Sequence, residues 1–156
     1  MDTRTYTVIF NGVAATVQQD LFAFLAAAGK PFELCELHLS QSNRVGDAQE
    51  EELTYLIKTG ATTAGSGGTA PTPIPTGITS AAAGFTARVN DTTKASAGTI
   101  VTKFINNWNI RGEEIKIWPE NLRYWCTGGE RMTIELAKTP SVSITISGTA
   151  VIREFG

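Results

Sequence analysis

The strongest constraint on the fold of this 156-residue chain is a regular alternation of residue types near its C-terminus. Between residues 142 and 152, Val, Ile, Gly and Ala occupy every second position, and Ser and Thr fill most of the positions between them. Successive side chains of a β-strand point to opposite faces of its sheet. The segment is therefore predicted to be a strand that places one face in a core and the other in solvent.

Shorter segments of the same kind are predicted along the rest of the chain. Turn-forming Gly, Pro, Asn and Asp separate them, and Asn11-Gly12 predicts a hairpin with a return strand over 13–17. About eight strands without a βαβ rhythm predict one all-β domain over 1–156, an antiparallel β-sandwich with jelly-roll-like topology. Apart from the C-terminal segment, the predicted strands cover residues 3–10, 32–41, 81–89, 99–105, 114–118 and 131–137.

Two segments fit either a helix or a strand. Residues 20–29 combine a helical stripe of apolar residues with an alternation, and the strands predicted on both sides favour a strand. Residues 47–59 begin with a capping-box pattern, Asp47 followed by Glu50, which is typical of a helix start. A strand remains equally compatible with this second segment, because alternate positions hold Leu53, Tyr55 and Ile57.

Residues 59–79 consist almost entirely of Gly, Thr, Ala, Ser and Pro and carry no charge. Glycine leaves the backbone free, and proline removes hydrogen-bond donors, so this segment is predicted to be a long loop inserted within the domain. Long loops are usually functional. We expect this loop to reach onto a neighbouring molecule, with a protein interface formed by Thr69, Pro71, Pro73, Ile74 and Pro75.

All three tryptophans lie between residues 104 and 125. Aromatic rings on a β surface bind sugars or bases, and they also anchor protein–protein contacts. Some of these rings are needed for the core. Because Trp118, Pro119 and Glu120 follow a predicted strand end, they are predicted to be a second part of the protein interface.

Composition argues against several classes of function. Thirteen basic and fifteen acidic residues give a net charge of −2, and without a basic stripe we expect no nucleic-acid partner. No apolar run approaches the length of a membrane helix, so we expect no membrane partner. No signal-peptide pattern is visible at the N-terminus, which predicts synthesis in the cytoplasm.

No catalytic, metal-binding or cofactor-binding residues are predicted. His38 is the single histidine, no zinc-ligand spacing is present, and the glycines at 65–68 lack the following Gly-Lys-Ser/Thr of a phosphate loop. The acidic run at 50–52 is interpreted as a solvated cluster. Cys35 and Cys126 are far apart in sequence and are predicted to be buried, reduced thiols. We therefore expect a protein that is not an enzyme.

Six sequence segments together resemble small virion-associated proteins of tailed bacteriophages. They are LHLSQS at 37–42, VGDAQEE at 45–51, TTAGSGGTAPTPIP at 62–75, NDTTKASAGT at 90–99, WPE at 118–120 and SGTAVIREFG at 147–156.

The resemblance implies a jelly-roll-like capsid decoration or cement protein on the outside of the head. Its partners would be itself, as a homotrimer, and the major capsid protein, and its location would be the capsid surface of the virion after synthesis in the host cytoplasm. The alternative is a tail, baseplate or fibre component that binds a host surface carbohydrate near the tryptophans.

Overall fold

The computed structural model describes residues 3–42, 50–78 and 81–156, and in these ranges it contains β-strands, one short 3-10 turn and no α-helix. The strands are β1 (Thr3–Ala15), β2 (Gln19–Leu25), β3 (Phe32–Gln41), β4 (Glu52–Thr63), β5 (Ile74–Pro75), β6 (Thr86–Asp91), β7 (Ser96–Asn109), β8 (Glu114–Ile117), β9 (Tyr124–Cys126), β10 (Arg131–Leu136) and β11 (Ile144–Phe155). The 3-10 turn η1 covers Glu120–Leu122.

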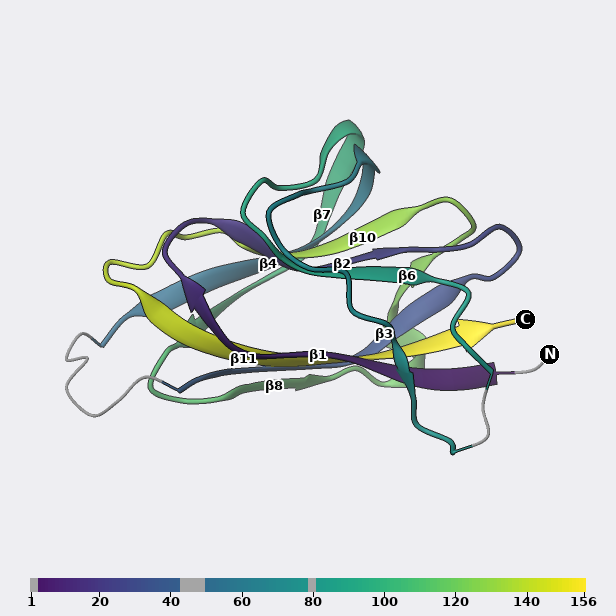
Figure 1. The fold of residues 1–156 in the computed structure, drawn as a ribbon, viewed down its shortest axis with the longest axis horizontal. Coiled ribbons are helices and arrows are strands. Elements are labelled where there is room, and N and C mark those ends of the chain that lie inside the picture. Colours follow the sequence, from purple (N-terminus) through teal and green to yellow (C-terminus); the bar gives the residue numbers. More distant parts are fainter. Residues whose placement is uncertain (1–2, 43–49, 79–80) are drawn as a thin grey trace.

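Two antiparallel sheets pack face to face (Figure 1). The six-stranded sheet has the order β5-β1-β11-β3-β8, with β9 also paired to β3, and the five-stranded sheet has the order β6-β2-β10-β4-β7. Without β5, β6 and β9, the remaining strands form sheets β1-β11-β3-β8 and β2-β10-β4-β7, which is the strand order of a jelly roll. The predicted all-β sandwich is confirmed.

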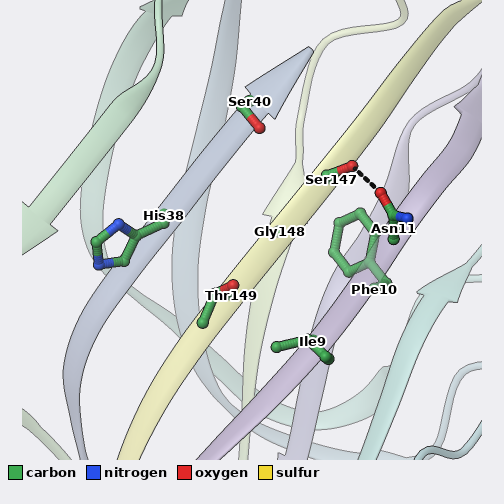
Figure 2. A pocket seen from close by; sticks show the side chains of 8 residues that line it. All are labelled: Ile9, Phe10, Asn11, His38, Ser40, Ser147, Gly148 and Thr149. Carbon is green, nitrogen blue, oxygen red and sulfur yellow. Dashed lines mark hydrogen bonds between the residues drawn. The ribbon is translucent and has the colours of Figure 1, made fainter. Parts of the chain in front are cut away.

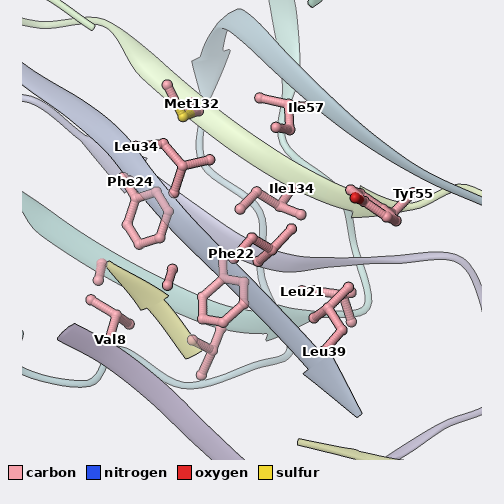
Figure 3. Close-up of a cluster of buried hydrophobic side chains, with 14 of the residues drawn as sticks. Val8, Leu21, Phe22, Phe24, Leu34, Leu39, Tyr55, Ile57, Met132 and Ile134 are labelled. Carbon is pink, nitrogen blue, oxygen red and sulfur yellow. The ribbon is translucent and has the colours of Figure 1, made fainter. Parts of the chain in front are cut away.

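The core lies between the two sheets and is rich in aromatic rings (Figure 3). The ring of Phe22 packs against that of Phe10 with 5.1 Å between centroids, and a Cβ atom at Gly148 would lie 2.7 Å from the Phe10 ring. The alternation in β11 is confirmed, because its inward positions are fully buried at Ile144, Ile146, Ala150 and Ile152. The predicted strand begins two residues too early, since Val142 is exposed and precedes β11.

Both ambiguous segments contain strands. Residues 20–29 contribute to β2, and 47–59 contribute to β4, whose Leu53, Tyr55 and Ile57 are fully buried in alternation. Burial of one strand face between two sheets therefore overrides the local helix signals. Asp47 of the predicted capping box lies outside the described residues.

The predicted hairpin at Asn11-Gly12 is wrong, because β1 continues through it. The pairing of β1 with β11 skips between Phe10 and Val13, and Gly12 has a φ of 64°. A glycine in this conformation supports a β-bulge, which inserts one extra residue and lets the strand continue. Asn-Gly therefore marks an irregularity in one long strand.

The predicted free loop at 59–79 is also wrong in its extent. The end of β4 occupies its first residues, and residues 64–78, which we call the strap, run from β6 in one sheet to β1 in the other. Isolated bridges join Ser66 to Thr93 and Thr69 to Val89, and β5 pairs with β1. The strap therefore bonds to its own chain along much of its length. Thr79 lies outside the described residues.

Glycine is required where the strap meets β6. A Cβ atom at Gly68 would lie 2.0 Å from the carbonyl oxygen of Val89, closer than any side chain can approach. The N–H of Gly68 donates to Asp91 Oδ1 at 3.0 Å, and Arg88 Nη2 donates to the same oxygen at 2.6 Å. The glycine-rich composition of the strap thus allows its backbone to lie close to the backbone of β6.

Asp91 belongs to a group of three carboxylates that are buried on adjacent strands, together with Asp20 and Glu135. Glu135 binds Lys58 and receives a hydrogen bond from Lys94 Nζ at 2.8 Å. Burial raises the pKa of Glu135, but hydrogen bonds from these lysines outweigh that effect and hold it below its usual range. The Lys94–Glu135 ion pair ties the β6–β7 turn to the five-stranded sheet.

Asp20 has no lysine or arginine within ion-pair distance among the described residues, and its Oδ2 accepts a hydrogen bond from the backbone N–H of Ala95 at 2.7 Å. Burial, opposed by that bond, raises the pKa of Asp20 from 3.8 to about 6. The folded state therefore binds this proton more tightly than the unfolded state. The contribution of Asp20 to stability is most favourable below about pH 4 and declines as the pH rises to about 6.

We expect the Asp20→Asn variant to be more stable than the wild type at pH 7.5, by about 1–2 kcal/mol. The asparagine oxygen still accepts from Ala95, whereas the buried negative charge is removed. At pH 4 the difference should shrink, because Asp20 is then protonated in the folded protein. Urea unfolding at both pH values measures this, with the exposed Glu113→Gln as control. An effect of the same size at both pH values would contradict the assignment.

Candidate interaction surface

The side chain of Trp118 determines which way β8 faces. It is 7% exposed, and its ring packs edge-on against Phe104 at 5.8 Å and Tyr124 at 5.7 Å. Because successive side chains of a strand point to opposite faces, Glu114 and Lys116 point inward like Trp118. Ile115 and Ile117 consequently point outward and are 44% and 65% exposed.

The inward polar residue of β8 has defined partners. Glu114 Oε1 accepts hydrogen bonds from Tyr55 Oη and Asn106 Nδ2, both at 2.7 Å. Lys116 Nζ lies 3.4 Å from the same carboxylate oxygen. In β8 the usual orientation is therefore reversed, with charged residues inward and isoleucines in solvent.

The outward isoleucines of β8 extend into two rows of side chains across the outer face of the six-stranded sheet. The strand registers place in the first row Ile115, His38, Thr149 and Ile9, and in the second row Ile117, Glu36, Val151, Thr7 and Ile74. Ile9 and Ile74 are each 49% exposed. We call this surface the outer face. Exposed apolar groups gathered on one face usually mark an interaction site.

A hollow of about 250 Å³ lies on the outer face over β1, β3 and β11 (Figure 2). Its polar lining includes hydroxyl groups, and Ser147 Oγ donates to Asn11 Oδ1 at 3.0 Å. His38 Nε2 lies 3.1 Å from Glu36 Oε2, so its hydrogen bond goes to a carboxylate and not to the hydroxyl of Ser40 or Thr149. The arrangement offers hydrogen-bonding groups for a contact, without an activated nucleophile.

One end of the outer face carries charge and an exposed aromatic ring. Glu33 is completely buried, and its Oε1 accepts from Arg123 Nη1 and Arg153 Nη2, both at 2.6 Å. Trp125, paired with Glu33 in β9, is 53% exposed and stacks on Phe155 with 5.1 Å between centroids. Phe155 thus covers one face of the Trp125 ring.

A second exposed region is the two-stranded arm formed by residues 60–63 of β4 and 96–102 of β7. It stands away from the sandwich at the top of Figure 1. Every residue from Ser96 to Lys103 is exposed, including Ile100 and Val101 at 38% and 43%. These two neighbours point to opposite faces, so the arm presents apolar groups on both sides.

Of the predicted contact residues at the end of β8, Trp118 is placed in the core of the chain, where it is 7% exposed. The reason is that burying a tryptophan ring stabilises the fold more than any exposed position can. Pro119 and Glu120 are exposed. Glu120 lies beside the charged end of the outer face, where it forms an ion pair with Arg153. A hydrogen bond from Arg153 lowers the pKa of Glu120.

The predicted contact residues of the strap are placed unevenly. Ile74 lies on the outer face and Thr69 is exposed, but Pro73 is buried, and Pro71 and Pro75 are half-buried. Sequence reasoning missed Ile9, Ile115 and Ile117, whereas Trp125 lies among the tryptophans considered for carbohydrate binding. The alternation of side chains along a strand could have revealed the two isoleucines of β8, because a buried Trp118 forces both of them outward.

The cysteines are free and buried, as predicted. Burial raises the pKa of Cys126 to about 12, so its thiol is protonated at neutral pH. A register shift in β3 places Leu34, and not Cys35, in the core cluster beside Leu37. In the described ranges, no three or more His, Cys, Asp or Glu side chains are arranged so that they could hold a metal ion. No helix in these ranges is long and apolar enough to cross a membrane.

Comparisons with protein-family models, with curated proteins and with solved structures gave no match.

We expect Trp118→Ala to lower the free energy of unfolding by about 3–5 kcal/mol, because it removes a buried indole from the core. Trp125→Ala, which removes a half-exposed ring, should cost about 1 kcal/mol or less. Urea denaturation of the two variants beside the wild type measures both. Equal losses would contradict the assignment of Trp118 to the core and Trp125 to the surface.

Proposed function

We propose that this protein is a non-enzymatic structural protein of a phage particle, a capsid decoration or cement protein that binds the exterior of the head. Its partners are the major capsid protein and further copies of itself. The observation that carries the proposal is that apolar residues are exposed in two separate places, the outer face and the arm. A subunit that binds both its own kind and a shell needs two contact surfaces.

The proposed action is mechanical. Two packed sheets form a rigid body, and stable protein interfaces bury about 1,200–2,000 Å² each. Repetition on a symmetric shell multiplies modest affinities through avidity. Each bound subunit would thus stabilise the junction between capsid subunits by adding buried area. The low content of charged residues, 18%, suits a surface covered by neighbours.

We assign the head contact to the arm. Two-stranded ribbons are marginally stable alone in water, and partner surfaces supply the burial that they lack. The outward edge of β7 has no paired strand among the described residues, so its backbone can accept an added strand. Ile100 and Val101 would lie at the centre of such a contact.

One observation favours a second candidate function, a tail, baseplate or fibre component that binds a host carbohydrate. Trp125 is half exposed on a flat sheet face, with its ring held by Phe155. Sugars stack on such rings. Glycan binding that is lost in Trp125→Ala would support this candidate over the capsid role.

The test of the capsid role is binding to phage heads assembled without this protein. Wild-type protein should co-sediment with the heads and protect them against heating. The Ile100→Asp/Val101→Asp variant should stay folded, because both residues are exposed, and lose most of its head binding. Leu122→Asp, which changes a residue that is 60% exposed away from the arm, is the matched control.

Failure of wild-type protein to bind the heads would refute the capsid role. Equal binding by the arm variant and the wild type would refute the assignment of the head contact to the arm.

A further inference from the structure

We propose that the outer face binds a second copy of this chain, face to face, about a two-fold axis that crosses the strands near Ala150 of β11. This inference rests on the proposed function in one respect, since a decoration protein needs self-association. It names the surface and the symmetry of that association, a two-fold axis in place of the homotrimer that the resemblance implies.

The argument begins with the two rows of the outer face. A two-fold axis lying between two stacked sheets and across their strands reverses the strand direction. If it passes between the rows, the first row of one copy lies over the second row of the other. Ile115 then lies over the partner's Ile117, and Ile117 over the partner's Ile115. Four isoleucines that are exposed in the single chain would cover one another.

The same two-fold rotation also brings polar residues of the two rows opposite residues of different chemical character. His38 lies over the partner's Glu36, and Glu36 lies over the partner's His38. Each chain already holds these two groups 3.1 Å apart, and both side chains are partly exposed, at 38% and 36%. Stacking would bring each imidazole over the partner's carboxylate, in addition to the carboxylate of its own chain. No like charges meet at these positions.

Further along β11, the same axis sets Ser147 over the partner's Arg153. Ser147 borders the hollow of about 250 Å³, whose lining also supplies the hydroxyl groups of Ser40 and Thr149. A guanidinium donates hydrogen bonds, and these oxygens accept them. Arg153 Nη2 is already bonded to Glu33 and Glu120, so its remaining N–H groups would meet the hydroxyl groups of the partner's hollow.

The size of the outer face approaches that of a standard interface. Its five strands differ in length, from 2 residues in β5 to 13 in β1, and together contain 41 residues. At about 3.3 Å per residue and about 4.8 Å per strand they cover roughly 650 Å², compared with about 800 Å² per partner in a standard interface. Sheets stacked in sandwiches lie about 10 Å apart, which allows the side chains of both faces to meet.

The decisive experiment is site-specific cross-linking of the full chain. Ile115→Cys and Ile117→Cys proteins are prepared separately, mixed and treated with a short bismaleimide. The mixture should give more cross-linked dimer than either protein alone, because residues 115 and 117 face each other directly across the axis, whereas identical residues are offset by about 6.6 Å along the strand. The native cysteines are buried and give a low background. Ile105→Cys, exposed on the other sheet, is the control.

Solution mass by light scattering gives the second readout. Wild-type protein and Ile105→Glu should be dimers or assemblies of dimers, and Ile117→Glu should be monomeric with an unchanged β-sheet circular dichroism spectrum. A monomeric wild type, an assembly that survives Ile117→Glu, or equal cross-linking in the mixture and in the single variants would overturn the inference. Head binding is scored separately, so failure of the capsid role is distinguished from failure of the dimer.

Discussion

The burial of Trp118 at the end of β8 is the constraint on which the proposed surface depends. Once this ring packs against Phe104 and Tyr124, the alternation of side chains along the strand forces Ile115 and Ile117 to point outward. Reversing the strand would bury the isoleucines and expose a tryptophan. It would also remove Glu114 from its hydrogen bonds with Tyr55 and Asn106. The fold thus gains core packing while it leaves apolar groups on its outside.

The jelly-roll strand order makes the orientation of β8 affect the surface of the whole six-stranded sheet. Because β8 lies at the edge of the six-stranded sheet, its outward isoleucines extend the rows that begin at β1 and β5 on the other edge. The strap closes the opposite side by bonding to both sheets, so it is part of the scaffold. The arm, in contrast, is exposed along its β7 half, from Ser96 to Lys103. The arm is therefore separate from the scaffold, whereas the outer face is one side of it.

Much of the fold could be predicted from the sequence, because burial of one strand face leaves a period-two pattern. The strands β3, β10 and β11 follow from such patterns, and the sandwich follows from their number. The strap could not be predicted, because isolated backbone bridges at Ser66 and Thr69 leave no side-chain period. Its close approach to Val89 requires Gly68, and glycine in a sequence signals flexibility as readily as contact.

The candidate surface was harder to predict than the fold. Sequence patterns place isoleucine inside a strand, and only the position of Trp118 shows that β8 is reversed. Two predicted interface residues, Ile74 and Glu120, do lie on or beside the outer face, although they were chosen for composition and strand-end position. A contact surface depends on which strands are neighbours, and registers between distant strands are not encoded in local patterns.

The most direct test of the central claim is hydroxyl-radical footprinting of β8, comparing the dilute free protein with the assembled particle. The account predicts strong labelling of Ile115 and Ile117 in the free chain and a large loss of labelling after assembly. Equal labelling of both isoleucines in the two states would show that the outer face remains open to water, and would contradict its role as a contact surface.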